Sequence, residues 1–291
     1  MGRVQTFPPP VMNPRSLRPA STGTLQAQVR SPTAFSSSAG RAAGLHSARV
    51  PCRVMTRIPH TQRNTGHELM DEAHPDPARL GNEFRFLVKF NAATGSGTAI
   101  VDALRSRMSP TSGQQVSVVD FGAGVGDIAR SFITRAARRG WVAHCLATDR
   151  NPLVLDMARA RGSMDGLSFA AVDVLQAKAI LGAKSFDAAH ASLMLHHLPD
   201  HEVVEALKAM SAVARHAVIW NDLIHDAFGI AGAWFATLTS PAETKRDAML
   251  SVKNGFSKRQ AVEFAEAAGL RDIRVRRWRG PRFLLTARPA D

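Results

Sequence analysis

From residue 116 onward, short apolar runs alternate with segments in which apolar residues recur every three or four positions. The short runs over 116–121, 141–149, 167–174, 185–195 and 216–223 predict buried strands, and the segments between them predict helices. Strands separated by helices in this way are typical of a mainly parallel sheet with helices on both faces. Two last runs, 273–280 and 281–289, predict an antiparallel hairpin that closes the sheet.

Helical spacing also marks the segments on either side of this alternation. Residues 68–108 predict two or three short helices, the first of them capped by Asp76. Residues 225–250 predict a helical insertion, followed by a capped helix over 255–270. An apolar stripe in the insertion either lines a pocket or packs against the sheet; it consists of Phe228, Ile230, Trp234 and Phe235.

The N-terminal segment differs in composition from the remainder of the chain. Residues 1–66 are rich in Pro, Ser, Ala and Arg and carry no apolar period, so we expect a disordered tail. The segment contains no Asp or Glu. It fits an organellar transit peptide, and it fits equally well an upstream extension of the reading frame with the true start at Met55 or Met70. We therefore expect a tail over 1–66, a helical extension over 67–112 and a catalytic domain over 113–291. The expected location is cytoplasmic, or organellar if the tail is a transit peptide.

Net charge changes this picture little. Residues 1–67 hold nine Arg and no acidic residue, so most of the net charge of +13 belongs to the tail. The folded part is only mildly basic, and we expect no nucleic-acid partner. A second basic cluster, Arg271 to Arg282, is interpreted as a solvated strand edge. Cys52 and Cys145 are far apart and match no metal-binding spacing, so no metal site is expected.

The string VVDFGAGVGD over 118–127 carries the strongest chemical signal. Asp120 ends a strand, Gly122, Gly124 and Gly126 follow at alternate positions, and a helix begins. Such glycines let a ligand approach main-chain N–H groups beyond the carboxyl end of a strand. A dinucleotide fingerprint would have Gly or Ala where Asp127 stands, which disfavours a pyrophosphate. Asp120 is instead suited to attract an ammonium group.

Three further strands end in polar residues. Asp149 ends the second strand, where a carboxylate can accept hydrogen bonds from both hydroxyls of a ribose. Asp173 follows the third strand and is suited to accept a hydrogen bond from an adenine amino group. The fourth strand leads through Ser192 into the string LMLHHLPD, which contains His196 and His197.

Together these motifs resemble class I S-adenosylmethionine (SAM)-dependent methyltransferases over residues 115–290. The resemblance implies a Rossmann-like, seven-stranded sheet in the order 3-2-1-4-5-7-6, with strand 7 antiparallel. It assigns Gly122, Gly124 and Gly126 to the methionine part of SAM, Asp149 to its ribose and Asp173 to its adenine; Asp120 and Ser192 complete the expected cofactor site. Phe121 departs from the small or polar residue that is frequent there, which we expect to alter packing only.

The predicted function is methyl transfer to a small molecule. Short strings such as ELMDEAHPDPARL, VIWNDL and SVKNGFS resemble methyltransferases of type III polyketide and quinone-like biosynthesis, which implies a phenol, quinol or polyketide hydroxyl as acceptor. Candidates for removing its proton are His196, His197 and Asp222, each of which has a structural role as the alternative. A non-catalytic SAM-binding relative and an NAD(P)-dependent oxidoreductase are the alternative functions.

Overall fold

The computed structural model describes residues 66, 68–72, 75–238 and 242–291. These residues belong to a compact unit over Val54–Asp291, while a second unit, Met1–Arg53, lies outside the described residues. The expected tail over 1–66 therefore falls outside them too, apart from Gly66. No described helix combines the length and the apolar character needed to cross a bilayer.

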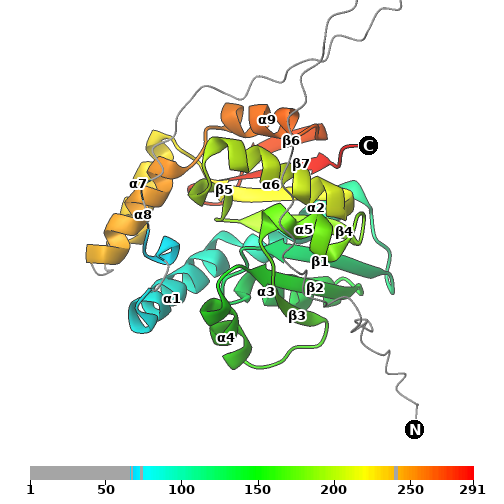
Figure 1. Ribbon diagram of the computed structural model, residues 1–291, viewed down its shortest axis with the longest axis horizontal. Coiled ribbons are helices and arrows are strands. Elements are labelled where there is room, and N and C mark those ends of the chain that lie inside the picture. The colour runs from blue at the N-terminus through cyan, green and yellow to red at the C-terminus, as the bar shows by residue number, and fades with distance from the viewer. Residues whose placement is uncertain (1–65, 67, 73–74, 239–241) are drawn as a thin grey trace, which may run out of the picture. The chain divides into compact units, whose positions relative to one another are not determined.

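The core of the fold is a seven-stranded sheet in the order β3-β2-β1-β4-β5-β7-β6 (Figure 1). Its strands are β1 (Gln115–Phe121), β2 (Val142–Asp149), β3 (Leu167–Ala171), β4 (Phe186–Ser192), β5 (Ala214–Leu223), β6 (Arg271–Arg277) and β7 (Arg282–Arg288). The first five strands pair in parallel, and β7 runs antiparallel to both β5 and β6. This topology confirms the order implied by the sequence resemblance.

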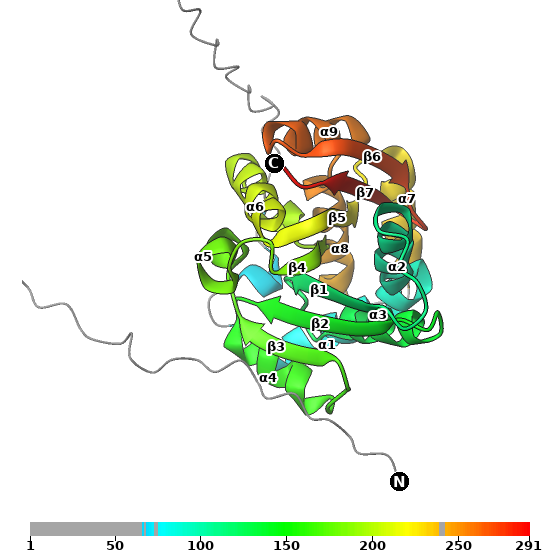
Figure 2. The same ribbon diagram turned by 90° about the vertical axis from the view of Figure 1, so that its right-hand side faces the viewer.

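Helices cover both faces of the sheet (Figure 2). Apart from the insertion after β5, the helices that follow the glycine-rich turn are α3 (Asp127–Ala137), α4 (Pro152–Ala160), η3 (Val174–Gln176), α5 (Ala177–Leu181), η4 (Leu195–His197), α6 (Asp200–Val213) and α9 (Lys258–Ala267). One core cluster joins Ile100 and Phe132 to one face of the sheet, and another joins Leu207 and Phe264 to the other face. The parallel strands are consequently buried from both sides, which explains their continuous apolar runs.

Local sequence explains where several helices begin. Asp76 accepts a hydrogen bond from the backbone N–H of Arg79 at 2.8 Å, and Asn151 accepts one from Leu153 N–H at 3.0 Å. Each cap stands directly before a proline in the first helical turn. Both helix starts follow the sequence prediction.

The N-terminal segment and the insertion after β5 come together at one end of the sheet. The first contributes η2 (Leu69–Asp71), α1 (Pro77–Thr94) and α2 (Ser96–Arg107), and the second contributes α7 (Ala227–Ala236) and α8 (Ala242–Asn254). Thr244 on α8 donates a hydrogen bond to the buried carboxylate of Glu83 on α1 at 2.6 Å. Side chains from η2, α1, α7 and α8 line a shared cavity, so these elements build the site described next.

Candidate functional site

A large cavity of about 460 Å³ opens at the carboxyl ends of β1, β2, β3 and β4. Residues from the predicted motifs line it, including Gly122, Gly124, Asp149, Asp173 and Ser192. The structure thus brings together side chains from four strand ends. This edge is where ligands bind in open parallel sheets.

The glycine-rich turn forms the floor of the large cavity. Gly122 and Gly124 have φ values of +60° and +54°, in the left-handed region that favours glycine. A Cβ atom on Gly122 would lie 2.4 Å from Cγ of Met194, so the turn also has no room for a side chain there. Gly126 has φ +73° and caps α3, where it packs near Phe169 and is not among the cavity's lining residues.

Two of the predicted carboxylates face the large cavity and also accept hydrogen bonds from backbone N–H groups around it. Asp149 accepts hydrogen bonds from Gly124 N–H at 3.1 Å and from Asn151 N–H at 3.0 Å. Burial raises the pKa of Asp149, although these backbone hydrogen bonds lower it in part. Asp173 accepts a hydrogen bond from Leu175 N–H at 2.9 Å and caps η3, two residues beyond the end of β3.

Asp120 stands near the end of β1, as predicted, and is buried there beside a histidine of β4. Its side chain is 1% exposed, and it does not line the large cavity. Its Oδ1 lies 2.7 Å from Nδ1 of His190, which is itself completely buried in β4. A direct contact between Asp120 and a ligand's ammonium group therefore remains a prediction, while its contact with His190 joins β1 to β4.

Arg282 is a site residue that sequence reasoning missed. Its guanidinium is fully buried behind Ser192 and donates hydrogen bonds to Ser192 Oγ and to the backbone oxygen of Asn221. It also donates to Oδ1 of Asn91, Oγ1 of Thr94 and Oγ of Ser96. Burial lowers its pKa to about 10. The interpretation of the cluster Arg271 to Arg282 as a solvated strand edge is wrong for this residue.

Carboxylates dominate the charged lining of the large cavity. Six acidic side chains line it: Asp71, Glu72, Asp127, Asp149, Asp173 and Glu202. Arg150 is the single Arg or Lys among the lining residues that the structure describes. Burial raises the pKa of Asp127, which nevertheless accepts a hydrogen bond from Asn91 Nδ2 at 3.0 Å. This electrostatic environment favours a cationic ligand over a polyphosphate.

The predicted catalytic histidines lie side by side in η4, and each contacts a carboxylate through Nδ1. His196 Nδ1 is 2.6 Å from Oδ1 of Asp222, and His197 Nδ1 is 3.1 Å from Oδ2 of Asp71. Asp222 lies inside β5, is completely buried and does not line the large cavity, so its contact with the site runs through His196. Burial alone would raise the pKa of Asp222 and of Asp71, but the histidine beside each lowers it overall.

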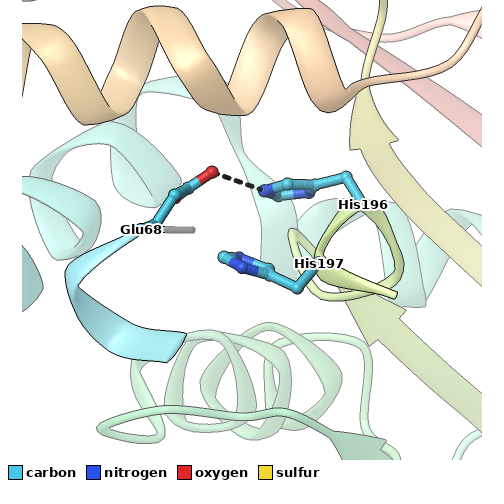
Figure 3. Close-up of side chains that lie close together, drawn as sticks. All are labelled: Glu68, His196 and His197. Atoms are coloured by element: carbon cyan, nitrogen blue, oxygen red, sulfur yellow. Dashed lines mark ion pairs between the residues drawn. The ribbon is translucent and has the colours of Figure 1, made fainter. Parts of the chain in front are cut away.

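Glu68 completes this group from the N-terminal segment (Figure 3). Its Oε1 lies 3.9 Å from Nε2 of His196, and its side chain is only 5% exposed. Burial raises the pKa of Glu68 to about 7, even though His197 and Ser251 lower it in part. Glu68, His196 and His197 are called the His–Glu cluster below. Glu68 and Asp71 were not among the predicted site residues, because both stand far from the glycine-rich motif along the chain.

A smaller apolar cavity of about 60 Å³ adjoins the His–Glu cluster. Its apolar lining comes from several elements and includes Met70, Phe86, Leu87, Phe90, Leu193, Leu223, Ala233, Val252 and Pro281. It shares Met70, Leu87, Leu193 and His197 with the large cavity, so the two cavities are neighbours. Of the predicted apolar stripe, Ile230 and Trp234 are exposed, and the side chains of Phe228 and Phe235 lie outside the described ones.

Comparisons with known proteins agree with this architecture. Residues 118–217 match the sequence family described as a methyltransferase domain. The fold resembles human N-acetylserotonin methyltransferase in complex with SAM at 16% identity and a TM-score of 0.53, covering 74% of this chain and 57% of that one. It resembles PigF with SAH at 17% identity and a TM-score of 0.56, covering 76% and 62%. An O-methyltransferase family protein from Burkholderia thailandensis matches at 15% identity and a TM-score of 0.51, covering 70% and 57%.

These comparisons concern the fold. The chain spans about three fifths of the length of these three solved structures. No curated protein sequence matches it. The seven-stranded sheet in this order is therefore the fold of class I methyltransferases, and the reaction has to be argued from the site itself.

Proposed function

We propose that this chain is a SAM-dependent methyltransferase that acts on a small molecule. The observation that carries the proposal is the large cavity at the glycine-rich turn, whose lining holds six carboxylates and one Arg. SAM is a nucleoside that carries a sulfonium and an ammonium cation, and it contains no phosphate. An acidic cavity at this edge of the sheet suits such a ligand and disfavours the pyrophosphate of NAD(P).

The lining residues fit the parts of SAM in the order that the motifs imply. Asp149 retains acceptor capacity beyond its two backbone hydrogen bonds, which is what the hydroxyls of a ribose require. Asp173 would lie toward the adenine, and Gly122 and Gly124 toward the methionine part. Ser192 and Asp127 border the same cavity, and Asp127 is a second candidate, beside the predicted Asp120, for contact with the ammonium group.

The acceptor is proposed to lie in the apolar cavity, beside the His–Glu cluster. Its lining includes Phe86 and Phe90, and this environment suits an aromatic acceptor such as a phenol, a quinol or an aromatic polyketide. A narrow cavity covered by α1, α7 and α8 favours a small molecule over a folded protein or a nucleic acid. The cavity must widen to admit a ring, which movement of these covering helices would allow.

The chemistry requires a nucleophile aligned with the sulfonium methyl group that bound SAM supplies. The apolar cavity holds the acceptor away from water and orients it toward the shared wall of the two cavities. His197 lies at this wall and His196 lines the apolar cavity beside it, and both are proposed to activate the acceptor hydroxyl for loss of its proton. Asp222 and Asp71 act as positioning residues, because each fixes the ring of one histidine through Nδ1.

Calorimetric titration of the purified protein with SAM and, separately, with NADH tests the cofactor. We expect micromolar binding of SAM and no binding of NADH. A folded sample that binds NADH but not SAM would overturn the proposal in favour of an oxidoreductase. Mass spectrometry of reactions with phenols and quinols then measures transfer, and SAM binding without turnover on any acceptor would favour a non-catalytic relative.

A further inference from the structure

Three metal-ligating side chains converge beside the apolar cavity. Glu68 precedes η2, and His196 and His197 are neighbours in η4 (Figure 3). One ligand atom from each of the three lies within 4.8 Å of the other two. Glu68 and His196 are almost fully buried, with exposures of 5% and 2%. Two histidines and one carboxylate on one side of a site are the donor set of many zinc and non-haem iron centres.

We propose that Glu68, His196 and His197 bind a divalent transition-metal ion such as Zn²⁺ or Fe²⁺. The first argument is the unsatisfied Oε1 of Glu68, which is buried and has no hydrogen-bond partner among the described residues. An oxygen of this kind is costly to bury without a compensating partner. It points toward His196, with 3.9 Å between Oε1 and Nε2, and a cation between the two would satisfy it.

The second argument is the outer shell of carboxylates. Metal-bound histidines typically donate their other ring N–H to a carboxylate, which fixes the ring orientation and makes the free nitrogen a better ligand. Both histidines here have that arrangement, with Asp222 at Nδ1 of His196 and Asp71 at Nδ1 of His197. In each case the carboxylate leaves Nε2 as the nitrogen available to a metal. A pair of histidines with only packing roles would not need a separate carboxylate for each ring, one fully buried at Asp222 and one partly buried at Asp71.

The geometry requires a modest contraction on binding. Donors about 2.1 Å from a metal ion lie about 3–3.5 Å from one another in tetrahedral or octahedral sites. The present separations of up to 4.8 Å are larger, so the three donors must close around the ion. Glu68 precedes a helix of only three residues, which gives it more freedom to move than a residue inside the sheet.

The open side of the site faces the apolar cavity, which the same three residues help to line. Three protein ligands leave at least one coordination position for another group. An acceptor oxygen in that position would lose its proton more easily, because a bound metal lowers the pKa of a coordinated hydroxyl. With the ion bound, His196 and His197 would be ligands and not proton acceptors, so the proton would leave to the solvent through the adjoining large cavity. This role for the ion rests on the proposed methyl transfer, whereas metal binding itself does not.

Binding of Co²⁺ to the full-length protein tests the proposal. Protein treated with a chelator and dialysed is titrated with Co²⁺, and its visible absorption reports nitrogen and oxygen ligation. The chain contains other potential ligands, such as Cys52 and His60, so the decisive comparison is with variants. We expect the wild type to bind one Co²⁺ ion per chain. The affinity for Co²⁺ should fall at least tenfold in Glu68→Gln and in His197→Asn. His201→Ala, whose side chain is 68% exposed on α6, is the matched control and should bind normally.

Zn²⁺ competition and SAM calorimetry on the same samples separate the possible outcomes. Zn²⁺ should displace Co²⁺ from the wild type, and melting temperatures show whether each variant is folded. Equal Co²⁺ affinity in the wild type and a folded Glu68→Gln variant would overturn the metal site. If SAM still binds in that case, the proposed function stands without the metal. Loss of SAM binding with intact metal binding would instead contradict the proposed function alone.

Discussion

Oδ1 of Asp222 lies 2.6 Å from Nδ1 of His196, and both side chains are buried. The same carboxylate accepts hydrogen bonds from Trp220 Nε1 at 3.0 Å and from the backbone N–H of Leu223 at 2.8 Å. These contacts hold the carboxylate in place, and the carboxylate in turn fixes His196. The other ring nitrogen of His196 is thereby directed toward Glu68 and the apolar cavity.

Replacing Asp222 by Asn should separate acceptor activation from cofactor binding. We expect turnover to fall by about 10- to 100-fold, the range typical for removing a carboxylate that orients a metal-bound histidine. SAM affinity should not change, because Asp222 does not line the large cavity. Steady-state kinetics with an identified acceptor and calorimetry with SAM measure the two effects. Asp156→Asn, at an exposed carboxylate on α4, is the control. Normal turnover in a folded Asp222→Asn variant would remove Asp222 from the mechanism.

Replacing Asp149 by Ala should have the opposite effect and weaken SAM binding. The loss of hydrogen bonds to a charged carboxylate is expected to cost about 1.5–3 kcal/mol, or roughly 10- to 150-fold in Kd. Calorimetric titration with SAM measures it, and the melting temperature shows whether the turn at Gly124 survives the change. Asp156→Ala serves as the control. An unchanged SAM affinity in folded Asp149→Ala protein would refute the ribose role.

The sequence predicted the sheet well, because its signals are local. Apolar runs marked the parallel strands, Asn151 and Pro152 marked a helix start, and glycines marked the turn at the cavity. The positive φ values of Gly122 and Gly124 show why these positions favour glycine. Strand order is not a local property, and it followed only from the resemblance to a family of known fold.

The residues that the sequence did not reveal are those brought to the site from distant segments. Glu68 and Asp71 precede the first long helix, and no periodic pattern distinguishes them from surface carboxylates. Arg282 stands in a basic cluster that favours a solvated strand edge, yet it is fully buried at the start of β7. Only the tertiary packing of β7 against β5 places its guanidinium behind Ser192.

Arg282 should therefore matter for stability. Replacing it by Met removes a buried cation and leaves Asn91, Thr94 and Ser96 without their shared donor. We expect a loss of about 1–3 kcal/mol in the free energy of unfolding, the scale for leaving buried polar groups without a hydrogen-bond partner. Urea denaturation measures it. Arg288→Met, at a half-exposed arginine of the same strand, should change stability by no more than about 0.5 kcal/mol. A small loss at Arg282 comparable to that at Arg288 would show that the network is dispensable.

Gly122→Ala tests the glycine-rich turn by a steric argument. The new Cβ would need a left-handed backbone, which costs roughly 1–2 kcal/mol, and would also lie 2.4 Å from Met194 Cγ. Gly113 has φ +82° but no neighbouring heavy atom within 4 Å of such a Cβ, so Gly113→Ala carries the backbone strain alone. We expect Gly113→Ala to lose some stability and keep its SAM affinity.

Gly122→Ala should lose more stability than Gly113→Ala. Its affinity for SAM should fall at least tenfold, because Met194 must move into the large cavity that both residues line. Equal SAM affinity in the two variants would show that the close contact at Gly122 does not shape the cofactor site.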